Sequence, residues 1–210
     1  MDKDKAIGIF TELRRQNPNP KCELDYINPY TLLVAVVLSA RSTDKGVNKA
    51  TEALFKVADN PKSMVELGEE GLKEYISTIG LYKNKAKFII KLSQDLLDKH
   101  NGEVPNDQKA LEALAGVGRK TANVVRNEIF EEPLFAVDTH VFRVSNRTGL
   151  ATGDDVVEVE EKLIKTVPKE FAAKAGHWLI LHGRYTCKAR KPLCESCPIT
   201  QFCKYYSEQG

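Results

Sequence analysis

Four of the five cysteines are grouped near the C-terminal end of the chain, at Cys187, Cys194, Cys197 and Cys203. Four thiolates in so short a segment can enclose a tetrahedral Zn²⁺ ion or an iron–sulfur cluster. Zinc sites more often contain two Cys-x2-Cys pairs, whereas the spacing here, Cys-x6-Cys-x2-Cys-x5-Cys, contains one. The spacing therefore predicts a metal centre and favours iron and sulfur over zinc.

The loop between the first two of these cysteines is basic, with Lys188, Arg190 and Lys191. Residues 184 to 206 contain five basic side chains and one acidic side chain, a local net charge of +4, in a chain whose net charge is +2. A loop of this kind, held rigid by a metal, would contact a nucleic-acid phosphate. The alternative is a basic loop that is only solvated.

A turn with two glycines, Gly116 and Gly118, precedes a segment with a helical pattern. Glycine can adopt positive φ and lets another backbone approach closely, and N–H groups at a helix N-terminus favour a phosphate oxygen. The alternative is a connector that uses glycine only to turn. With its neighbours the turn has the pattern Leu-x-Gly-apolar-Gly-x-x-Thr-Ala, the helix-hairpin-helix signature of DNA-repair proteins. The candidate DNA-binding residues here are Gly116, Val117, Gly118, Arg119 and Thr121.

Lys120 lies in the first turn of the helix after this hairpin, where the helix dipole and Arg119 both disfavour a charged ammonium group. A neutral amine can attack a carbon that forms a Schiff base, such as C1′ of a deoxyribose. The alternative is a lysine that binds phosphate or solvent. Asp138 follows an apolar run and precedes a helical pattern, so it is expected to be an N-cap. An ionised cap can also stabilise an oxocarbenium-like sugar.

Helical patterns dominate the rest of the chain, because Ala, Leu, Lys and Glu recur at spacings of three and four. Turn and cap residues separate the segments, and an all-α fold follows. The segment 30–39 is apolar on every side, which predicts a central helix. The predicted helices are residues 2–16, 30–39, 44–57, 61–67, 69–77, 83–99, 107–114, 119–128, 139–147, 154–165 and 169–185.

Length and composition limit the class of protein. A chain of 210 residues with 42% hydrophobic residues can bury a core, as one domain or two small lobes. Its first residues lack the apolar centre of a signal peptide, and its longest apolar run, residues 32–38, is far short of the ~20 residues of a membrane helix. We therefore expect a cytoplasmic protein, nucleoid-associated if bacterial, without a membrane span. In a reducing compartment the grouped cysteines are metal ligands rather than disulfide partners, and Cys22 is a bystander.

Three motifs in this order, the hairpin with its lysine, the segment 137–140 and the cysteine spacing, resemble the endonuclease III family of DNA glycosylases. The resemblance covers the full chain and includes residues 38–40, 43–44, 78–82, 102–105 and 177–184.

The resemblance implies two α-helical lobes with a DNA-binding cleft between them. One would be a six-helix barrel at residues 22–132, with the helix-hairpin-helix at about 107–128. The other would combine residues 1–21 and 133–210 and contain the cluster loop 187–203.

The resemblance also implies an activity. Lys120 corresponds to the family's nucleophile, Asp138 to its essential carboxylate, and the cysteines to ligands of a [4Fe–4S] cluster with a structural and DNA-binding role. The implied reaction is excision of an oxidised pyrimidine, followed by β-elimination that cuts the strand 3′ to the abasic site. The implied partner is double-stranded DNA containing a damaged base or an abasic site, bound by a monomer.

Two further positions concern lesion recognition. A damaged nucleotide must leave the stack, and Leu81 corresponds to the family's apolar wedge for the gap; the alternative is a core leucine. Arg41 stands where the family commonly has Gln to contact the orphaned strand, and Arg offers only hydrogen-bond donors, whereas Gln offers a donor and an acceptor. Ala115 stands where the family often has Pro.

Two other functions stay open at this level. One is a mismatch-directed (T:G) glycosylase of the same superfamily, since the pocket residues are dispersed in the sequence. The other is a non-catalytic helix-hairpin-helix DNA-binding module with a structural metal.

Overall fold

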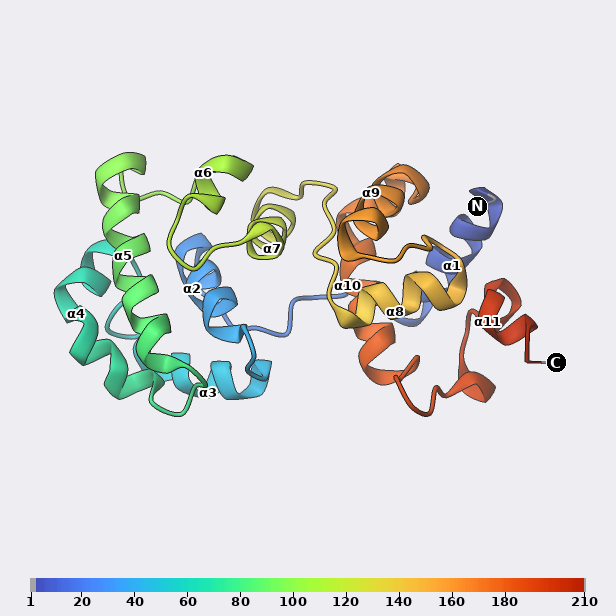
Figure 1. Ribbon diagram of the computed structural model, residues 1–210, viewed down its shortest axis with the longest axis horizontal. Helices are drawn as coiled ribbons and strands as arrows, with labels where there is room; N and C mark the ends of the chain where they lie inside the picture. The colour runs from blue at the N-terminus through green and yellow to red at the C-terminus, as the bar shows by residue number, and fades with distance from the viewer. Residues whose placement is uncertain (1–2, 210) are drawn as a thin grey trace. The chain divides into compact units, whose positions relative to one another are not determined.

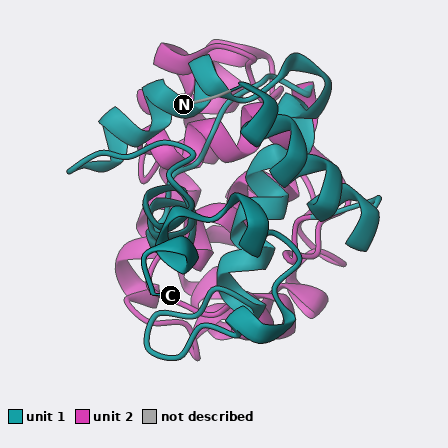
Figure 2. Ribbon diagram, turned by 90° about the vertical axis from the view of Figure 1, so that its right-hand side faces the viewer, with its two compact units in different colours: residues 1–21, 131–210 teal, residues 22–130 magenta. Residues whose placement is uncertain are grey.

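The computed structural model describes residues 3–209, and over that range the chain is helical and contains no strand (Figure 1). The expected all-α class is therefore confirmed. No helix in these residues is long and apolar enough to cross a membrane. The chain divides into two compact units, residues 22–130 and residues 1–21 with 131–210, which Figure 2 distinguishes by colour.

The unit of residues 22–130 surrounds one apolar helix, α2 (Pro29–Ser39). Every residue of α2 from Tyr30 to Leu38 is buried, as expected for a central helix. The side chains of Asn28 and Thr31 each accept an N–H of the other residue, and Pro29 occupies the first helical position, so the helix start is fixed locally. The remaining helices of this unit are α3 (Asp44–Leu54), α4 (Pro61–Ile76), α5 (Tyr82–His100), α6 (Gln108–Glu112) and α7 (Arg119–Phe130).

Packing in this unit places α3, α5 and α7 against α2, while α4 runs along α5. The break predicted between residues 67 and 69 appears as a kink within α4, where Gly68 has φ 73° and ψ 170°. Only glycine adopts such a backbone without strain.

The unit of residues 1–21 and 131–210 has a core that joins both ends of the chain. Phe10 of α1 (Lys3–Gln16) stacks on Phe171 at 5.6 Å between ring centroids, and Trp178 donates its indole N–H to the carbonyl of Asn17 at 2.7 Å. The N-terminal segment is therefore built into the C-terminal part of the chain. The other elements are α8 (Thr139–Thr148), α9 (Val156–Thr166), α10 (Lys169–Tyr185), η1 (Cys194–Ser196), η2 (Thr200–Phe202) and α11 (Lys204–Ser207).

Some helix bounds differ from the sequence-based prediction. α3 ends at Leu54 rather than 57, and α6 has five residues rather than eight. α9 begins at Val156 rather than 154, because Asp155 is its N-cap and accepts the N–H groups of Val157 and Glu158. The short helices among the cysteines were not predicted. The chain there is too short for a periodic pattern, and its shape depends on tertiary contacts.

Candidate functional site

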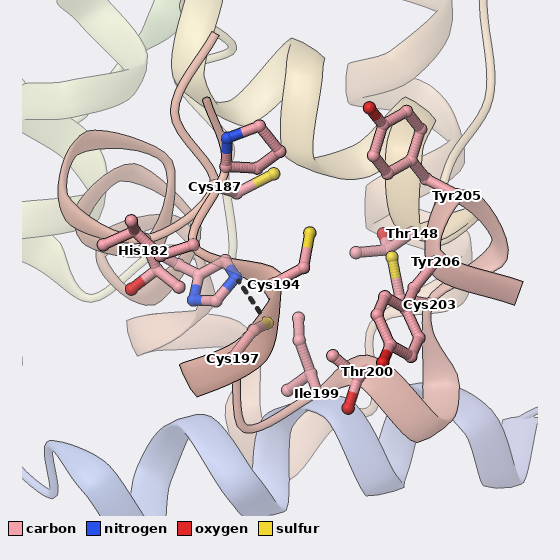
Figure 3. A pocket seen from close by; sticks show the side chains of 13 residues that line it. Thr148, His182, Cys187, Cys194, Cys197, Ile199, Thr200, Cys203, Tyr205 and Tyr206 are labelled. Carbon is pink, nitrogen blue, oxygen red and sulfur yellow. Dashed lines mark hydrogen bonds between the residues drawn. The ribbon is translucent and has the colours of Figure 1, made fainter. Parts of the chain in front are cut away.

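The four grouped cysteines line one hollow, together with side chains such as Thr148, His182, Ile199 and Tyr205 (Figure 3). All four are free thiols and partly buried. They come from the segment after α10, from η1, from the residue that follows η1, and from the junction of η2 and α11. Residues that are well separated in the loop therefore present sulfur to the same space.

The donor chemistry of this hollow fits an iron–sulfur cluster. Its lining has four thiols and no carboxylate, and soft sulfur ligands select zinc or iron–sulfur centres. Among residues 3–209, no three His, Cys, Asp or Glu side chains close on one point as the ligands of a single ion would. Four cysteine thiolates are the usual ligands of a [4Fe–4S] cluster.

Protonation matters for this site because only thiolates ligate metal. Burial raises the pKa of the Cys197 and Cys203 thiols, and the neighbouring cysteine sulfurs raise it further. Burial lowers the pKa of His182 to about 4, so its ring is neutral at neutral pH, with Nε2 3.7 Å from the sulfur of Cys197. Cluster assembly therefore has to displace protons from the buried thiols.

Two arginines of α8 hold the cysteine loop, a role that was not predicted from the sequence. Arg143 donates to the carbonyls of Cys187 (2.9 Å) and Gly183 (2.8 Å). Arg147 donates to the carbonyls of Lys188 (2.7 Å) and Ala189 (2.8 Å). Their spacing of four residues places both on one helix face, which was the available signal.

The main chain of the basic loop is thus held while its charged side chains are exposed. Lys188, Arg190 and Lys191 are all exposed to solvent. Besides the bonds from Arg147, the N–H of Leu193 donates to the carbonyl of Thr186 at 2.9 Å and closes the loop. A fixed backbone with outward cations is the arrangement that a phosphate contact requires.

The loop is also docked on α1. A Cβ added to Gly8 would overlap the ring of Phe202, so glycine is what allows α1 to lie this close to η2. Isolated glycine within a helical pattern often has such a packing reason, and this contact was not predicted.

The predicted hairpin consists of α6, a turn at residues 113–118 and α7. Buried Leu114 and Val117 anchor the turn, and the N–H of Val117 donates to the carbonyl of Leu114 at 3.1 Å. The first N–H donor of the α7 ladder is that of Ala122, to Gly118 at 3.0 Å. The N–H groups just before it belong to the helix N-terminus, where an anion is favoured.

Of the two glycines in the turn, only Gly116 has the positive φ that glycine can adopt. Gly116 has φ 77°, and a Cβ there would lie 3.0 Å from side-chain atoms of Phe88. Gly118 does not have positive φ, and a Cβ there would meet nothing within 4 Å. Gly116 is therefore needed by the fold, while Gly118 leaves open space beside the start of α7.

The two candidate catalytic residues lie in different units. Lys120 is the second residue of α7 in the unit 22–130, and it is exposed. Asp138, in the other unit, is the N-cap of α8, as expected. Its Oδ1 accepts the N–H groups of His140 (2.8 Å) and Val141 (2.9 Å).

The two candidate recognition residues lie in neighbouring turns of the unit 22–130. Arg41 (φ 58°) and Leu81 (φ 61°) both have left-handed backbones, which cost roughly 1–2 kcal/mol each for residues with a Cβ. A Cβ added to Gly80 would lie 3.7 Å from the carbonyl oxygen of Arg41, so the turns are adjacent. Leu81 is 58% exposed, which excludes the alternative of a core leucine.

Comparisons with known proteins agree with these motifs. Residues 34–169 match the family model described as HhH-GPD superfamily base excision DNA repair protein. Residues 187–203, the cysteine loop, match the iron–sulfur binding domain of endonuclease III.

Similarity to individual proteins covers almost the whole chain. Endonuclease III of Haemophilus influenzae is 63% identical over 98% of this chain and 97% of that protein. Endonuclease III of Escherichia coli K12 is 60% identical over the same shares. A solved structure of a trapped covalent endonuclease III–DNA intermediate has a TM-score of 0.90 and 46% identity, covering 100% of this chain and 99% of that one.

This degree of similarity favours neither the T:G mismatch enzyme nor the non-catalytic module. The protein is a DNA glycosylase and abasic-site lyase that excises oxidised pyrimidines in base excision repair, and it carries the [4Fe–4S] cluster. The chain belongs to the endonuclease III family of helix-hairpin-helix DNA glycosylases.

Proposed function

We propose that Lys120 is the nucleophile and Asp138 the supporting carboxylate of this glycosylase and lyase. The observation that carries the proposal is the position of Lys120. It is exposed in the first turn of α7 and follows Gly118, which has open space beside it, by two residues. A phosphate bound at that helix N-terminus would bring the sugar of a neighbouring nucleotide within reach of the amine.

The chemistry follows from a lysine amine next to a sugar. Nζ of Lys120 bonds to C1′ while the bond from C1′ to the base breaks, and the base leaves with the electron pair and takes up a proton. One proton then moves from Nζ to O4′ as the sugar ring opens, which leaves a protonated imine. Loss of a C2′ proton expels the 3′ phosphate and cuts the strand, and water releases Lys120.

Asp138 suits the charge changes of this reaction. Positive charge develops on the sugar as the base departs, and an anion close by stabilises that charge. Both cap bonds of Asp138 are accepted by the same oxygen, Oδ1. Oδ2 is then the oxygen that would face the sugar.

Binding of the DNA is assigned to the hairpin turn and the cysteine loop. The hairpin would contact one phosphate through backbone N–H groups, and Lys188, Arg190 and Lys191 would contact others. The cluster supplies a rigid cross-link for the loop rather than a reaction step. Residues 22–130 would then act as the hairpin lobe, and residues 1–21 with 131–210 as the cluster lobe.

The covalent step is tested by trapping the imine. Wild-type protein, incubated with borohydride and an abasic duplex, should form a covalent adduct, and Lys120→Gln should form none. Lys109→Gln is the matched control, because Lys109 is an exposed lysine on the preceding helix of the same hairpin. Full trapping by Lys120→Gln would overturn the assignment of the nucleophile.

The role of Asp138 is tested by removing its charge while the helix cap is kept. Asparagine caps helices about as well as aspartate, so Asp138→Asn should leave the melting temperature nearly unchanged. Excision of thymine glycol should slow by about 10²-fold or more, as expected when an electrostatic stabiliser of the transition state is lost. Excision at the wild-type rate would reduce Asp138 to a structural cap.

The state of assembly is part of the same proposal. Each unit closes its own hydrophobic core within one chain, so we expect a monomer bound to each lesion. Light scattering of the complex with a short lesion duplex measures this directly, and a mass of two chains per duplex would contradict it.

A further inference from the structure

Lys85 is a buried lysine in the first turns of α5, only 5% exposed. It occupies the apolar stripe that continues through Ile89, Leu92 and Leu96, where a charged side chain is unusual. That irregularity was visible in the sequence, but its meaning depends on what the amine contacts.

The ammonium group of Lys85 has three protons and three acceptors. Nζ donates to the carbonyl of Leu38 at 2.8 Å, to the carbonyl of Ala40 at 2.7 Å, and to Oγ of Ser42 at 3.1 Å. Burial lowers the pKa of this amine, and the three bonds compensate for the lost solvation. α2 has no basic residue in its own last turn, so Lys85 supplies the cation that its C-terminus favours.

These acceptors flank Arg41 on both sides. Ala40 precedes Arg41 and Ser42 follows it, and the left-handed backbone of Arg41 persists only where its surroundings hold it. The side chain of Lys85 is therefore a clamp on the turn that presents Arg41.

The backbone of Lys85 engages the other recognition turn. Its N–H donates to the carbonyl of Leu81 at 3.1 Å, in the turn where Leu81 is left-handed and exposed. One residue thus bonds to both turns, through its main chain on one side and its amine on the other.

We propose that Lys85 is a positioning residue for lesion recognition. It holds the Arg41 turn and the Leu81 turn in a fixed position relative to each other, so that both side chains enter the DNA together. This inference rests on the proposed function and on the family resemblance, which connects Arg41 and Leu81 with lesion recognition. Extrusion of a base from a duplex needs both groups in place, whereas β-elimination on a single-stranded abasic oligonucleotide needs neither.

The test compares these two activities in three variants. Lys85→Met removes the amine, and Ser42→Ala removes one of its acceptors with little change in volume. Ser93→Ala is the matched control. It removes a buried hydrogen bond between α5 and α2, to the hydroxyl of Tyr30 at the opposite end of α2.

Under single-turnover conditions, excision of thymine glycol from a duplex should fall about tenfold or more in Lys85→Met, because three acceptors lose their donor. It should fall about two- to threefold in Ser42→Ala, because the Lys85 ammonium loses one of its three acceptors. Cutting of the single-stranded abasic oligonucleotide should stay within about twofold of wild type in all three variants, at a temperature where each is folded. Ser93→Ala should match wild type in both assays.

Duplex excision at the wild-type rate in both Lys85→Met and Ser42→Ala overturns the inference. So does a loss of both activities in equal proportion, which marks a purely structural role. If Lys85→Met does not fold, Ser42→Ala decides alone by the ratio of its two activities. Failure of the proposed function is seen separately, as trapping that persists in Lys120→Gln.

Discussion

The two glycines of the hairpin turn should respond differently to the same substitution. In Gly116→Ala, the left-handed backbone at φ 77° costs about 1–2 kcal/mol for a residue with a Cβ. The new Cβ would also lie 3.0 Å from Phe88, whose displacement costs about 1–3 kcal/mol. Alanine also makes the unfolded chain stiffer, which offsets about 0.4–1 kcal/mol of this loss of stability.

The expected net destabilisation of Gly116→Ala is thus on the order of 1–5 kcal/mol, which lowers the melting temperature by roughly 2–20 °C in a chain of this size. Gly118→Ala has ordinary φ and open space around the new Cβ. Replacing glycine by alanine just before the helix costs about 0.5–1 kcal/mol of stability, and the stiffer unfolded chain adds about 0.5–1 kcal/mol. The two contributions nearly cancel, so the melting temperature of Gly118→Ala should stay close to that of the wild type.

DNA binding should be affected in the reverse order, with Gly118→Ala impaired more than Gly116→Ala. The Cβ of Gly118→Ala would enter the space proposed for the phosphate, so affinity for a duplex with a non-cleavable abasic analogue should fall about tenfold at fixed salt. Gly116→Ala, measured well below its melting temperature, should bind more tightly than Gly118→Ala. Circular dichroism melts and fluorescence anisotropy measure the two quantities. A stable Gly116→Ala would refute the packing argument, and unimpaired binding by Gly118→Ala would refute the phosphate site.

Two further predictions concern the cysteine loop. Lys191→Glu should weaken DNA binding and reduce the slope of log affinity against log salt by about one, with an unchanged melting temperature, since about one phosphate contact is lost; an unchanged slope would make the loop merely solvated. Cys194→Ser should yield protein without the visible absorbance of the cluster and with weaker DNA binding, because only Ile199 of residues 187–203 is buried and the cluster would be lost as a cross-link between the four cysteines; a colourless wild type with stoichiometric zinc would contradict the cluster itself.

Much of the fold was predictable because its signals are local. The capping pair of Asn28 and Thr31 and the apolar surface of α2 are properties of short segments, and so is the cap at Asp138. The cysteine spacing is also a local signal, because all four ligands of the metal centre lie within one short segment of the chain. Helix periodicity and caps require no knowledge of distant residues.

What the tertiary structure decided are the contacts between segments far apart in the chain. Arg143 and Arg147 look like ordinary surface arginines until the carbonyls of the cysteine loop lie beside them. The difference between Gly116 and Gly118 depends on Phe88, a residue of another helix.

Lys85 shows most clearly what could not be predicted from the sequence. Its sequence context marks a lysine on an apolar stripe, but only the fold places the end of α2 against its amine. The sequence by itself determined the long helices, several of their caps and which residues can do chemistry. The tertiary structure decided which backbone groups accept hydrogen bonds from those side chains. The reason is that buried polar groups need hydrogen-bond partners, and packing determines which partners lie within reach.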